Sequence, residues 1–446
     1  MLAVRFFAAR LLAVAGFAVL AACASSGPSP SRGPVIVGEE DAGPVDPLGP
    51  YAEGEEATRY DRRGFVNPLH LRGEEPARVG LLLPFSAPSE GVRSIASAMF
   101  DAAQLATFEA GDRRFLLIPK DTRGDAQGAA AAARSALADG AEILLGPLFS
   151  EEVVAVAEVA RASGVPVIAF SSDVETGGDG VFLLSFPPEL EIARVTDYAV
   201  LQGISRFGLI APATDYGERV ASSFSEEIYV RGGVLVHEER YEQSPDQMLA
   251  PAKRLAAYAK EMVPVELRHR TDPNAPRDPA EEAGFTRGYQ AVLMPEQGTL
   301  LRALAPLLPY YDVDITKVKL LGVSAWNNPR LTREPALRGG WFAAPDPAIA
   351  AAFEQRFSAT FGQAPPRLSS LAYDATLLAA RLAKDPRRRG RFDVAAITDP
   401  NGYFGADGLF RLKADGSVER GLAILEIQPG GIRVIDPAPQ SFAPGF

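Results

Sequence analysis

Few side chains in this sequence have the types and spacing that catalysis or metal binding requires. The chain has one cysteine, Cys23, so neither an internal disulfide nor a thiolate-rich metal site can form. The three histidines, His70, His237 and His269, are scattered along the chain, which argues against a histidine metal site. The patterns typical of serine transpeptidases, serine hydrolases, nucleotide-binding loops and zinc peptidases do not occur. The sequence therefore predicts a non-enzymatic protein with no catalytic residue, cofactor or metal.

The composition is that of a folded protein. The chain has 446 residues, of which 47% are hydrophobic and 23% are charged. At about 100–200 residues per domain, this length predicts two or three compact units. The 45 Lys and Arg residues against 56 Asp and Glu residues give a net charge of −11, so a broad cationic surface for phosphates is not expected. Nucleic acid is therefore not predicted as a partner.

The N-terminus has the features of a secretory signal. Two basic residues, Arg5 and Arg10, precede the uncharged run Leu11 to Ala22, which is too short to cross a membrane as a helix. The run ends in Leu20-Ala21-Ala22-Cys23, which resembles the lipobox of bacterial lipoproteins. The resemblance implies a signal peptide over 1–22 and lipidation of Cys23, which would anchor the chain without a spanning helix. An incidental cysteine in an ordinary cleaved signal is the alternative.

The residue after Cys23 is Ala24 rather than the aspartate that often retains such lipoproteins at the inner membrane. The lipobox resemblance therefore implies the periplasmic face of the outer membrane. Residues 23–76 are rich in proline, glycine and acidic side chains, which predicts a flexible tether. The end of this tether is less polar, and its residues Tyr60, Phe65, Leu69, His70 and Leu71 could dock on the domain. We expect either a partly ordered segment that leads into the domain or a specific binding motif.

Short apolar runs alternate with helical patterns after residue 78, which is typical of parallel sheets covered on both faces. Strands are expected at 79–83, 115–118, 143–145, 165–170, 181–186, 207–210, 234–237, 289–294 and 318–323. Helices are expected at 95–108, 125–138, from 150, and at 189–201, 221–231, 249–260 and 299–308. The polar stretch 263–283 is interpreted as a surface loop or a partner contact. The cluster Arg387-Arg388-Arg389 with Arg391 is interpreted as a solvated loop or an anion site.

Several of these segments, in this order, resemble the type I periplasmic binding proteins of the leucine-binding branch. Within that branch the chain is most similar to the LppC-type, LpoA-like penicillin-binding protein activator lipoproteins. The resemblance covers roughly residues 78–437 and is carried by 78–86, 145–148, 164–172, 216–217, 371–375 and 402–421, the last containing an expected hairpin. It implies an α/β fold with two lobes, each a mainly parallel sheet flanked by helices.

In such a fold the chain crosses between the lobes three times. The resemblance implies a first lobe of 77–184 plus 327–400, a second lobe of 185–326 plus 401–436, and a tail of 437–446. Ligands of these sheets bind beyond the carboxyl ends of the strands, between the lobes.

The amino-acid receptors of this branch suggest which residues would line the cleft. The candidates carried over by position are Ser86, Ser150, Ser171, Ser172, Asp173, Tyr216 and Glu296. Hydroxyls and helix N-terminal amides suit a carboxylate, and a carboxylate opposite them suits an ammonium group. Roles in capping helices, forming turns or filling the core are the alternatives. Asp173 departs from the receptors, because an anion there disfavours a ligand's carboxylate.

Two functions follow from these resemblances. The first is a periplasm-facing lipoprotein that regulates peptidoglycan synthesis by contacting a peptidoglycan synthase, a penicillin-binding protein, with or without a small molecule in the cleft. The second is the substrate-binding receptor of an ABC transporter for amino acids or similar small polar solutes. The best-known activator relatives carry a helical-repeat domain ahead of the binding domain, and the tether is too short to hold one.

Overall fold

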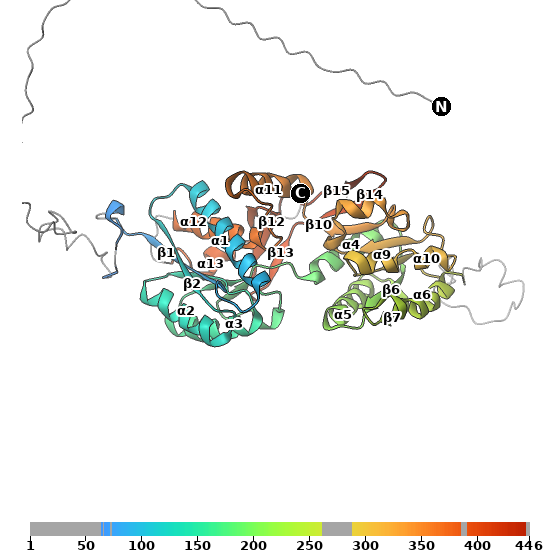
Figure 1. Ribbon diagram of the computed structural model, residues 1–446, viewed down its shortest axis with the longest axis horizontal. Coiled ribbons are helices and arrows are strands. Elements are labelled where there is room, and N and C mark those ends of the chain that lie inside the picture. Colours follow the sequence, from blue (N-terminus) through green and yellow to red (C-terminus); the bar gives the residue numbers. More distant parts are fainter. Residues whose placement is uncertain (1–63, 66, 72–73, 261–287, 385–389, 443–446) are drawn as a thin grey trace, which may run out of the picture. The chain divides into compact units, whose positions relative to one another are not determined.

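A computed structural model describes residues 64–65, 67–71, 74–260, 288–384 and 390–442. Cys23, Tyr60, His269, the stretch 263–283 and Arg387 to Arg389 lie outside these residues. Among the described residues the strands form three sheets, of five, seven and three strands (Figure 1).

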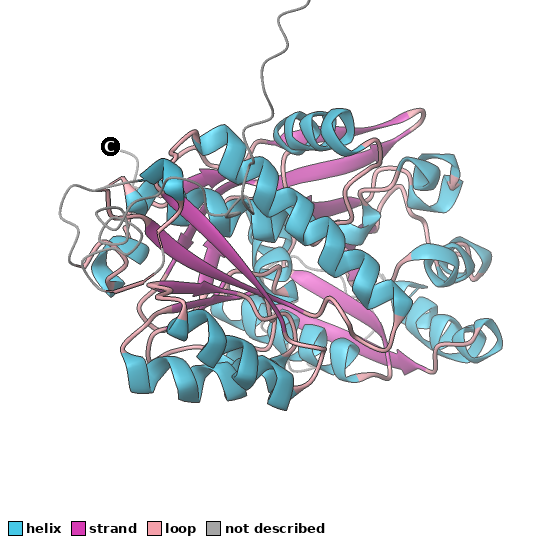
Figure 2. Cartoon of the chain, turned by 60° about the vertical axis from the view of Figure 1, so that its left-hand side comes forward, coloured by secondary structure: helices cyan, strands magenta, loops and turns pink. Residues whose placement is uncertain are grey.

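The five-stranded sheet is entirely parallel, in the order β2-β1-β3-β4-β5. Its apolar strands are buried because helices cover both faces, as Figure 2 shows. One face packs on α1 and α12, and the other face packs on α2 and α3. The strands are β1 (Ala77–Leu83), β2 (Phe115–Asp121), β3 (Ile143–Leu145), β4 (Val167–Ala169) and β5 (Val181–Leu183); the helices are α1 (Glu90–Ala110), α2 (Ala126–Ala138), α3 (Ser150–Ser163) and α12 (Ser369–Ala383).

The seven-stranded sheet has the order β15-β14-β10-β9-β8-β6-β7. Five of its strands are parallel neighbours, and β14 and β15 add an antiparallel edge. The strands are β6 (Arg206–Pro212), β7 (Val234–Tyr241), β8 (Ala291–Leu293), β9 (Lys319–Gly322), β10 (Trp341–Ala344), β14 (Ala423–Gln428) and β15 (Gly431–Asp436). The helices after residue 187 that belong to this half are α4 (Pro188–Leu201), α5 (Asp215–Val230), α6 (Pro245–Lys260), α9 (Gly298–Leu304) and α10 (Leu307–Tyr310).

The small antiparallel sheet consists of β11 (Tyr403–Gly405), β12 (Gly408–Leu412) and β13 (Val418–Arg420), and its β12–β13 hairpin confirms the one expected from the sequence. Its apolar residues share one buried cluster with β1, α1 and α12. Helices α11 (Pro347–Phe361) and α13 (Val394–Ile397) precede it. Short 3-10 turns occupy Leu69–Leu71, Val174–Thr176, Ser324–Trp326, Pro329–Arg333 and Pro335–Leu337.

Two of the expected lobe boundaries are wrong. The range 327–400, expected in the first lobe, contains β10, whose Trp341 and Phe342 pair with β9 and β14 in the second sheet. The range 401–436, expected in the second lobe, contains β11 to β13, whose Phe410 and Leu412 are buried with the first sheet's helices. The chain therefore crosses near residue 345 and near residue 421 rather than near 326 and 400. The expected boundaries come from the resemblance to the fold, which places the second and third crossings near residues 326 and 398, and not from the pattern of these strands.

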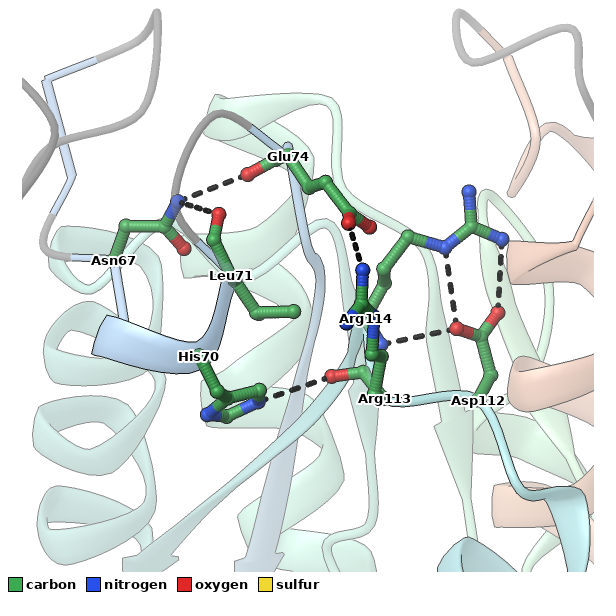
Figure 3. Close-up of polar contacts among 7 residues, drawn as sticks. All are labelled: Asn67, His70, Leu71, Glu74, Asp112, Arg113 and Arg114. Carbon is green, nitrogen blue, oxygen red and sulfur yellow. Dashed lines mark hydrogen bonds and ion pairs between the residues drawn. The ribbon is translucent and has the colours of Figure 1, made fainter.

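The lead-in to the first strand docks on the domain, as one reading of the sequence predicts (Figure 3). The side-chain amide of Asn67 donates to the backbone oxygens of Leu71 and Glu74, both at 2.9 Å, and Leu71 is fully buried. The ring of His70 lies 3.3 Å from the carbonyl oxygen of Arg113, and Glu74 pairs with the Arg113 guanidinium. The ordered domain therefore includes residues ahead of β1.

Candidate functional site

A cavity of about 320 Å³ opens where the carboxyl ends of the strands from both large sheets meet. The turn after β4 supplies Ser172, and the segment between β5 and α4 supplies Phe186. The other wall comes from the second sheet and its helices: Glu191 in the first turn of α4, Tyr216 and Arg219 on α5, Glu296 after β8, and Ser324 after β9. This is where ligands bind in open parallel sheets.

Glu296 is the most buried carboxylate of the cavity, with 4% of its surface exposed. Its Oε2 accepts from the Tyr241 hydroxyl at 2.7 Å and its Oε1 accepts from the Gln297 amide at 2.9 Å. The indole of Trp326 donates to the Glu296 carbonyl at 3.1 Å. Burial, followed by the hydrogen bond to this carboxylate, raises the pKa of Tyr241, so its hydroxyl remains a donor at neutral pH.

Glu191 and Tyr216 extend the acidic side of the cavity. The Ser324 amide donates to Glu191 Oε2 at 2.7 Å, but burial outweighs this bond and raises the pKa of Glu191. Burial also raises the pKa of Tyr216, and the negative charges of Glu191 and Glu296 add to that effect. Tyr216 therefore stays a neutral phenol beside two carboxylates, and this arrangement suits an ammonium group or another cationic donor.

Two arginines also line this cavity, and both already have partners. Arg219 Nε and Nη2 donate to the two Glu189 oxygens at 2.8 and 3.0 Å, and Nη2 also reaches the Ser172 carbonyl at 3.1 Å. Arg367 pairs with Asp407 at 2.8 Å. Each charge facing the cavity is thus compensated or hydrogen-bonded within the protein.

A second cavity, of about 450 Å³, lies beside the first and shares Ser172, Phe186 and Arg219 with it. Its other polar residues are Ser150, Ser171, Asp173 and Ser185. Ser150 is the first residue of α3, so the positive end of that helix faces this cavity. The second cavity is thus the hydroxyl-rich one, and the first is the carboxylate-rich one.

The comparisons with known proteins agree with this architecture. Residues 76–263 match the family model described as periplasmic binding protein. A branched-chain amino acid ABC transporter protein of Rhodospirillum rubrum superposes with a TM-score of 0.63 at 19% identity, covering 80% of this chain and all of that one. The domain has the type I periplasmic binding protein fold. The expected α/β class is confirmed.

Other proteins with this fold are similarly distant in sequence. A branched-chain amino acid ABC transporter periplasmic ligand-binding protein of Burkholderia xenovorans LB400 has a TM-score of 0.59 at 16% identity, covering 82% of this chain and 97% of its own. A solute-binding protein of Rhodopseudomonas palustris BisB5, in complex with 3,4-dihydroxybenzoic acid, has a TM-score of 0.53 at 18% identity, with 82% and 97% covered. These likenesses establish the fold.

One curated relative, the uncharacterized protein RP748 of Rickettsia prowazekii, is 21% identical over 178 residues. That match covers 40% of this chain and 47% of the relative, so the chain spans about half the length of the curated relative it matches.

Six of the seven cleft candidates from the sequence line at least one of the two cavities. Tyr216 and Glu296 line the first cavity; Ser150, Ser171 and Asp173 line the second; Ser172 lines both. Ser86 lines neither, because its hydroxyl donates to Asp121 Oδ2 at 2.5 Å and its amide donates to Oδ1 at 3.1 Å.

Some candidates also have local structural roles. The Ser171 hydroxyl accepts from the Asp173 amide at 3.1 Å. The Asp173 carboxylate accepts from the Glu175 amide at 3.2 Å, at the start of a 3-10 turn. The Asp173 carboxylate therefore stabilises its own turn, which is the alternative role that the sequence analysis gives for these residues.

The sequence missed Glu191, Arg219, Arg367 and Ser324. Arg219 lies three residues after Tyr216 on α5, and this helical spacing places the two on one face. Glu191 lies in the first turn of α4, directly after the crossing segment. Both residues could therefore have been predicted from the bounds of α4 and α5. No local sequence pattern predicts Arg367 as a cavity residue. It lies just before α12, and it lines the cavity because α12 packs against the small sheet.

Within the described ranges, no group of three or more His, Cys, Asp or Glu side chains is arranged to hold a metal ion. No helix among those residues is long and apolar enough to cross a membrane. Arg391, from the basic cluster of the sequence, pairs with Glu142 at 2.6 Å and is 8% exposed. It therefore stabilises the domain rather than offering a surface anion site.

Proposed function

We propose that this chain is a non-catalytic, lipid-anchored protein facing the periplasm, and that it regulates peptidoglycan synthesis by contacting a penicillin-binding protein. The observation that carries the proposal is the pairing of the charges that face the first cavity. Arg219 is held by Glu189, Arg367 by Asp407, and Glu296 by Tyr241 and the Gln297 amide. A receptor that loads and releases a solute must break such pairs, whereas a regulator acting through protein contacts can keep them.

The location in this proposal is supported by the sequence ahead of the described residues. Leu20-Ala21-Ala22-Cys23 has the lipobox pattern, and Ala24 favours the outer membrane by resemblance. Replacing Cys23 by serine is expected to release the protein from the membrane fraction and to abolish incorporation of labelled palmitate. Membrane association retained in that variant would contradict lipid anchoring.

The regulatory role is tested with the full lipidated chain in detergent. Purified penicillin-binding proteins are mixed with it, and both co-purification and the rate of glycan-strand synthesis are measured. We expect a stable complex and a faster rate. The absence of both a complex and a rate change with every synthase tested would refute the proposal. An unrelated periplasmic lipoprotein at the same concentration is the control.

Solute delivery to an ABC transporter is the second candidate. It is favoured by the acidic group of Glu191, Tyr216 and Glu296 at the carboxyl ends of the strands, and by structural relatives described as ABC transporter proteins. A ligand present at 100 times its dissociation constant adds about 2.7 kcal/mol to the free energy of unfolding. A thermal-shift screen of amino acids and related solutes therefore tests this role, and a flat screen argues against it.

A further inference from the structure

A third pocket, of about 250 Å³, lies between α12 and the small antiparallel sheet, and we call it the α12 pocket. It shares no residue with the two cavities described above. Its apolar walls are Leu377 and Leu378 from α12 and Tyr403, Phe404 and Phe410 from β11 and β12. Pockets for small molecules usually measure about 300–1,000 Å³, so this one suits a single large side chain.

Two polar side chains of α12 lie at different depths in the α12 pocket. Asp374 is 1% exposed, and its Oδ2 has no hydrogen-bond partner among the described residues. Arg381 is exposed and follows seven residues later, which is about 10 Å along the helix. A buried acceptor without a partner costs free energy, so a donor that enters the pocket gains that free energy back. The pocket therefore has an open acceptor at its base and a cation at its rim.

The positive charge at the rim is not neutralised by any carboxylate that the structure describes. The Arg381 guanidinium lies 5.3 Å from the centroid of the Tyr403 ring and forms no ion pair with a described residue. Lys384, also exposed, donates to a backbone carbonyl of α1 at 2.9 Å. Asp399 does not line the pocket, and it accepts from the amide and the side chain of Asn401 at 2.9 and 3.0 Å. The rim therefore complements a negatively charged partner.

We infer that the α12 pocket is a docking site for an acidic segment of a partner protein, and that this segment inserts a tyrosine. The ring packs on Phe404, the hydroxyl at its tip donates to Asp374 Oδ2, and a carboxylate beside the tyrosine pairs with Arg381. That carboxylate stays at the rim, about 10 Å from the base where Asp374 lies. Tyrosine and arginine are among the side chains that most often carry the binding energy of interfaces. The inference rests on the proposed function and deepens it, because it places the protein contact away from both cavities.

The test measures fluorescence anisotropy of labelled peptides with the full chain. The probe is a peptide of sequence Ala-Glu-Tyr-Glu-Ala with blocked ends, and two further peptides replace its tyrosine by phenylalanine or both of its glutamates by lysine. The wild-type chain is expected to bind the tyrosine peptide, and to bind the phenylalanine peptide at least about tenfold more weakly, because a hydrogen bond to a charged group is lost. The lysine peptide should bind at least about fivefold more weakly.

Variants at exposed residues test the rim and the wall without disturbing the core. Arg381→Ala is expected to weaken binding of the tyrosine peptide by up to about fivefold, as for an exposed ion pair. Phe404→Ala is expected to weaken it by about two- to tenfold, through loss of an aromatic contact. Lys384→Ala and Phe108→Ala are the matched controls, because both residues are exposed and lie outside the pocket. Both controls should bind the peptide as the wild-type chain does.

Three results with the peptides would overturn the inference: no binding of the tyrosine peptide, equal binding of the tyrosine and phenylalanine peptides, or equal losses in Arg381→Ala and Lys384→Ala. Self-association of the chain that disappears in Arg381→Ala, measured by sedimentation, would also overturn it, because a second copy would then fill the pocket.

Co-purification with penicillin-binding proteins separates this inference from the proposed function. Phe404→Ala is expected to reduce co-purification and Phe108→Ala to leave it unchanged. A synthase complex that Phe404→Ala leaves intact would overturn the placement of the contact at the α12 pocket. Binding of the tyrosine peptide with no synthase complex at all would refute the regulatory role and leave the docking site standing.

Discussion

The guanidinium of Arg367 stacks on the ring of Phe186, with its central carbon 3.5 Å from the ring centroid. Arg420 lies on the same ring at 4.4 Å and donates to the Ser185 carbonyl at 2.7 Å. Phe186 belongs to the segment that joins β5 to α4, where the chain passes from the first sheet to the second. The side chains of Arg367 and Arg420 therefore hold the segment between β5 and α4 in place beside the first cavity.

Replacing Phe186 by leucine should lower the free energy of unfolding by about 1–3 kcal/mol. The change removes two cation–π contacts, each worth about 0.5–2 kcal/mol, while keeping an apolar side chain. Urea denaturation measures the loss. Phe404→Leu, at a ring that is 48% exposed, is the control and should change stability by less than about 0.5 kcal/mol. Equal effects of the two substitutions would contradict the stacking role.

The buried carboxyl of Asp374 should make stability depend on pH. Burial, followed by the negative charge of Asp407, raises the pKa of Asp374 to about 7. One oxygen accepts from the Ala406 amide at 2.6 Å, and the other has no hydrogen-bond partner among the described residues. Because the folded pKa lies above the unfolded value, the contribution of this group is largest below about pH 4 and is lost as pH rises through about 7.

The Asp374→Asn variant tests that sign. Relative to the variant, the wild-type protein should lose up to about 1.4 kcal/mol of stability per pH unit between about pH 4 and pH 7. Urea unfolding across this range measures the difference. Asp246→Asn, at an exposed position on α6, should follow the wild-type curve. A constant offset between the wild-type protein and Asp374→Asn would show that Asp374 does not titrate in this range.

Tyr241→Phe should cost about 1–3 kcal/mol, because it removes the hydroxyl that donates to the buried Glu296 and leaves that carboxylate with one donor fewer. Thermal or urea unfolding gives the size of the loss. Tyr229→Phe removes a hydroxyl from a side chain that is 82% exposed and should have no measurable effect. An unchanged stability of Tyr241→Phe would mean that water replaces the lost donor.

The docked lead-in should contribute to the stability of the domain. Leu71 is fully buried, so Leu71→Ala is expected to cost about 2–5 kcal/mol. His70→Ala removes one exposed contact to the Arg113 carbonyl and should cost less than about 1 kcal/mol. Denaturation of both variants decides whether the lead-in is part of the fold, and a neutral Leu71→Ala would show that it is not.

The parallel strands were predictable from the sequence because they are buried on both faces and read as continuous apolar runs, as in β1 and β6. The helix expected at 299–308 was not as regular: α9 ends at Leu304 and α10 begins at Leu307, with Pro306 between them. Strand β10, with four residues, carried no periodic signal strong enough to assign it to the second sheet.

The candidate site was predictable only where a side chain directly follows a strand. Ser172 and Glu296 follow β4 and β8, so position along the chain located them. Arg367 faces the cavity because the buried small sheet holds its partner Asp407, and this pairing joins residues 40 positions apart. Such a contact depends on tertiary packing, which the spacing of neighbouring residues in the sequence does not predict.

Strands β14 and β15 complete the second sheet by adding an antiparallel edge beside β10. These two strands follow every other described strand along the chain, and β14 pairs with the edge of β10. The first sheet likewise waits for α12, which starts at residue 369. Each half therefore depends on segments that are synthesised well after its first strands. A nascent chain halted near residue 400 would present the unpaired edge of β10 to proteases and to other chains.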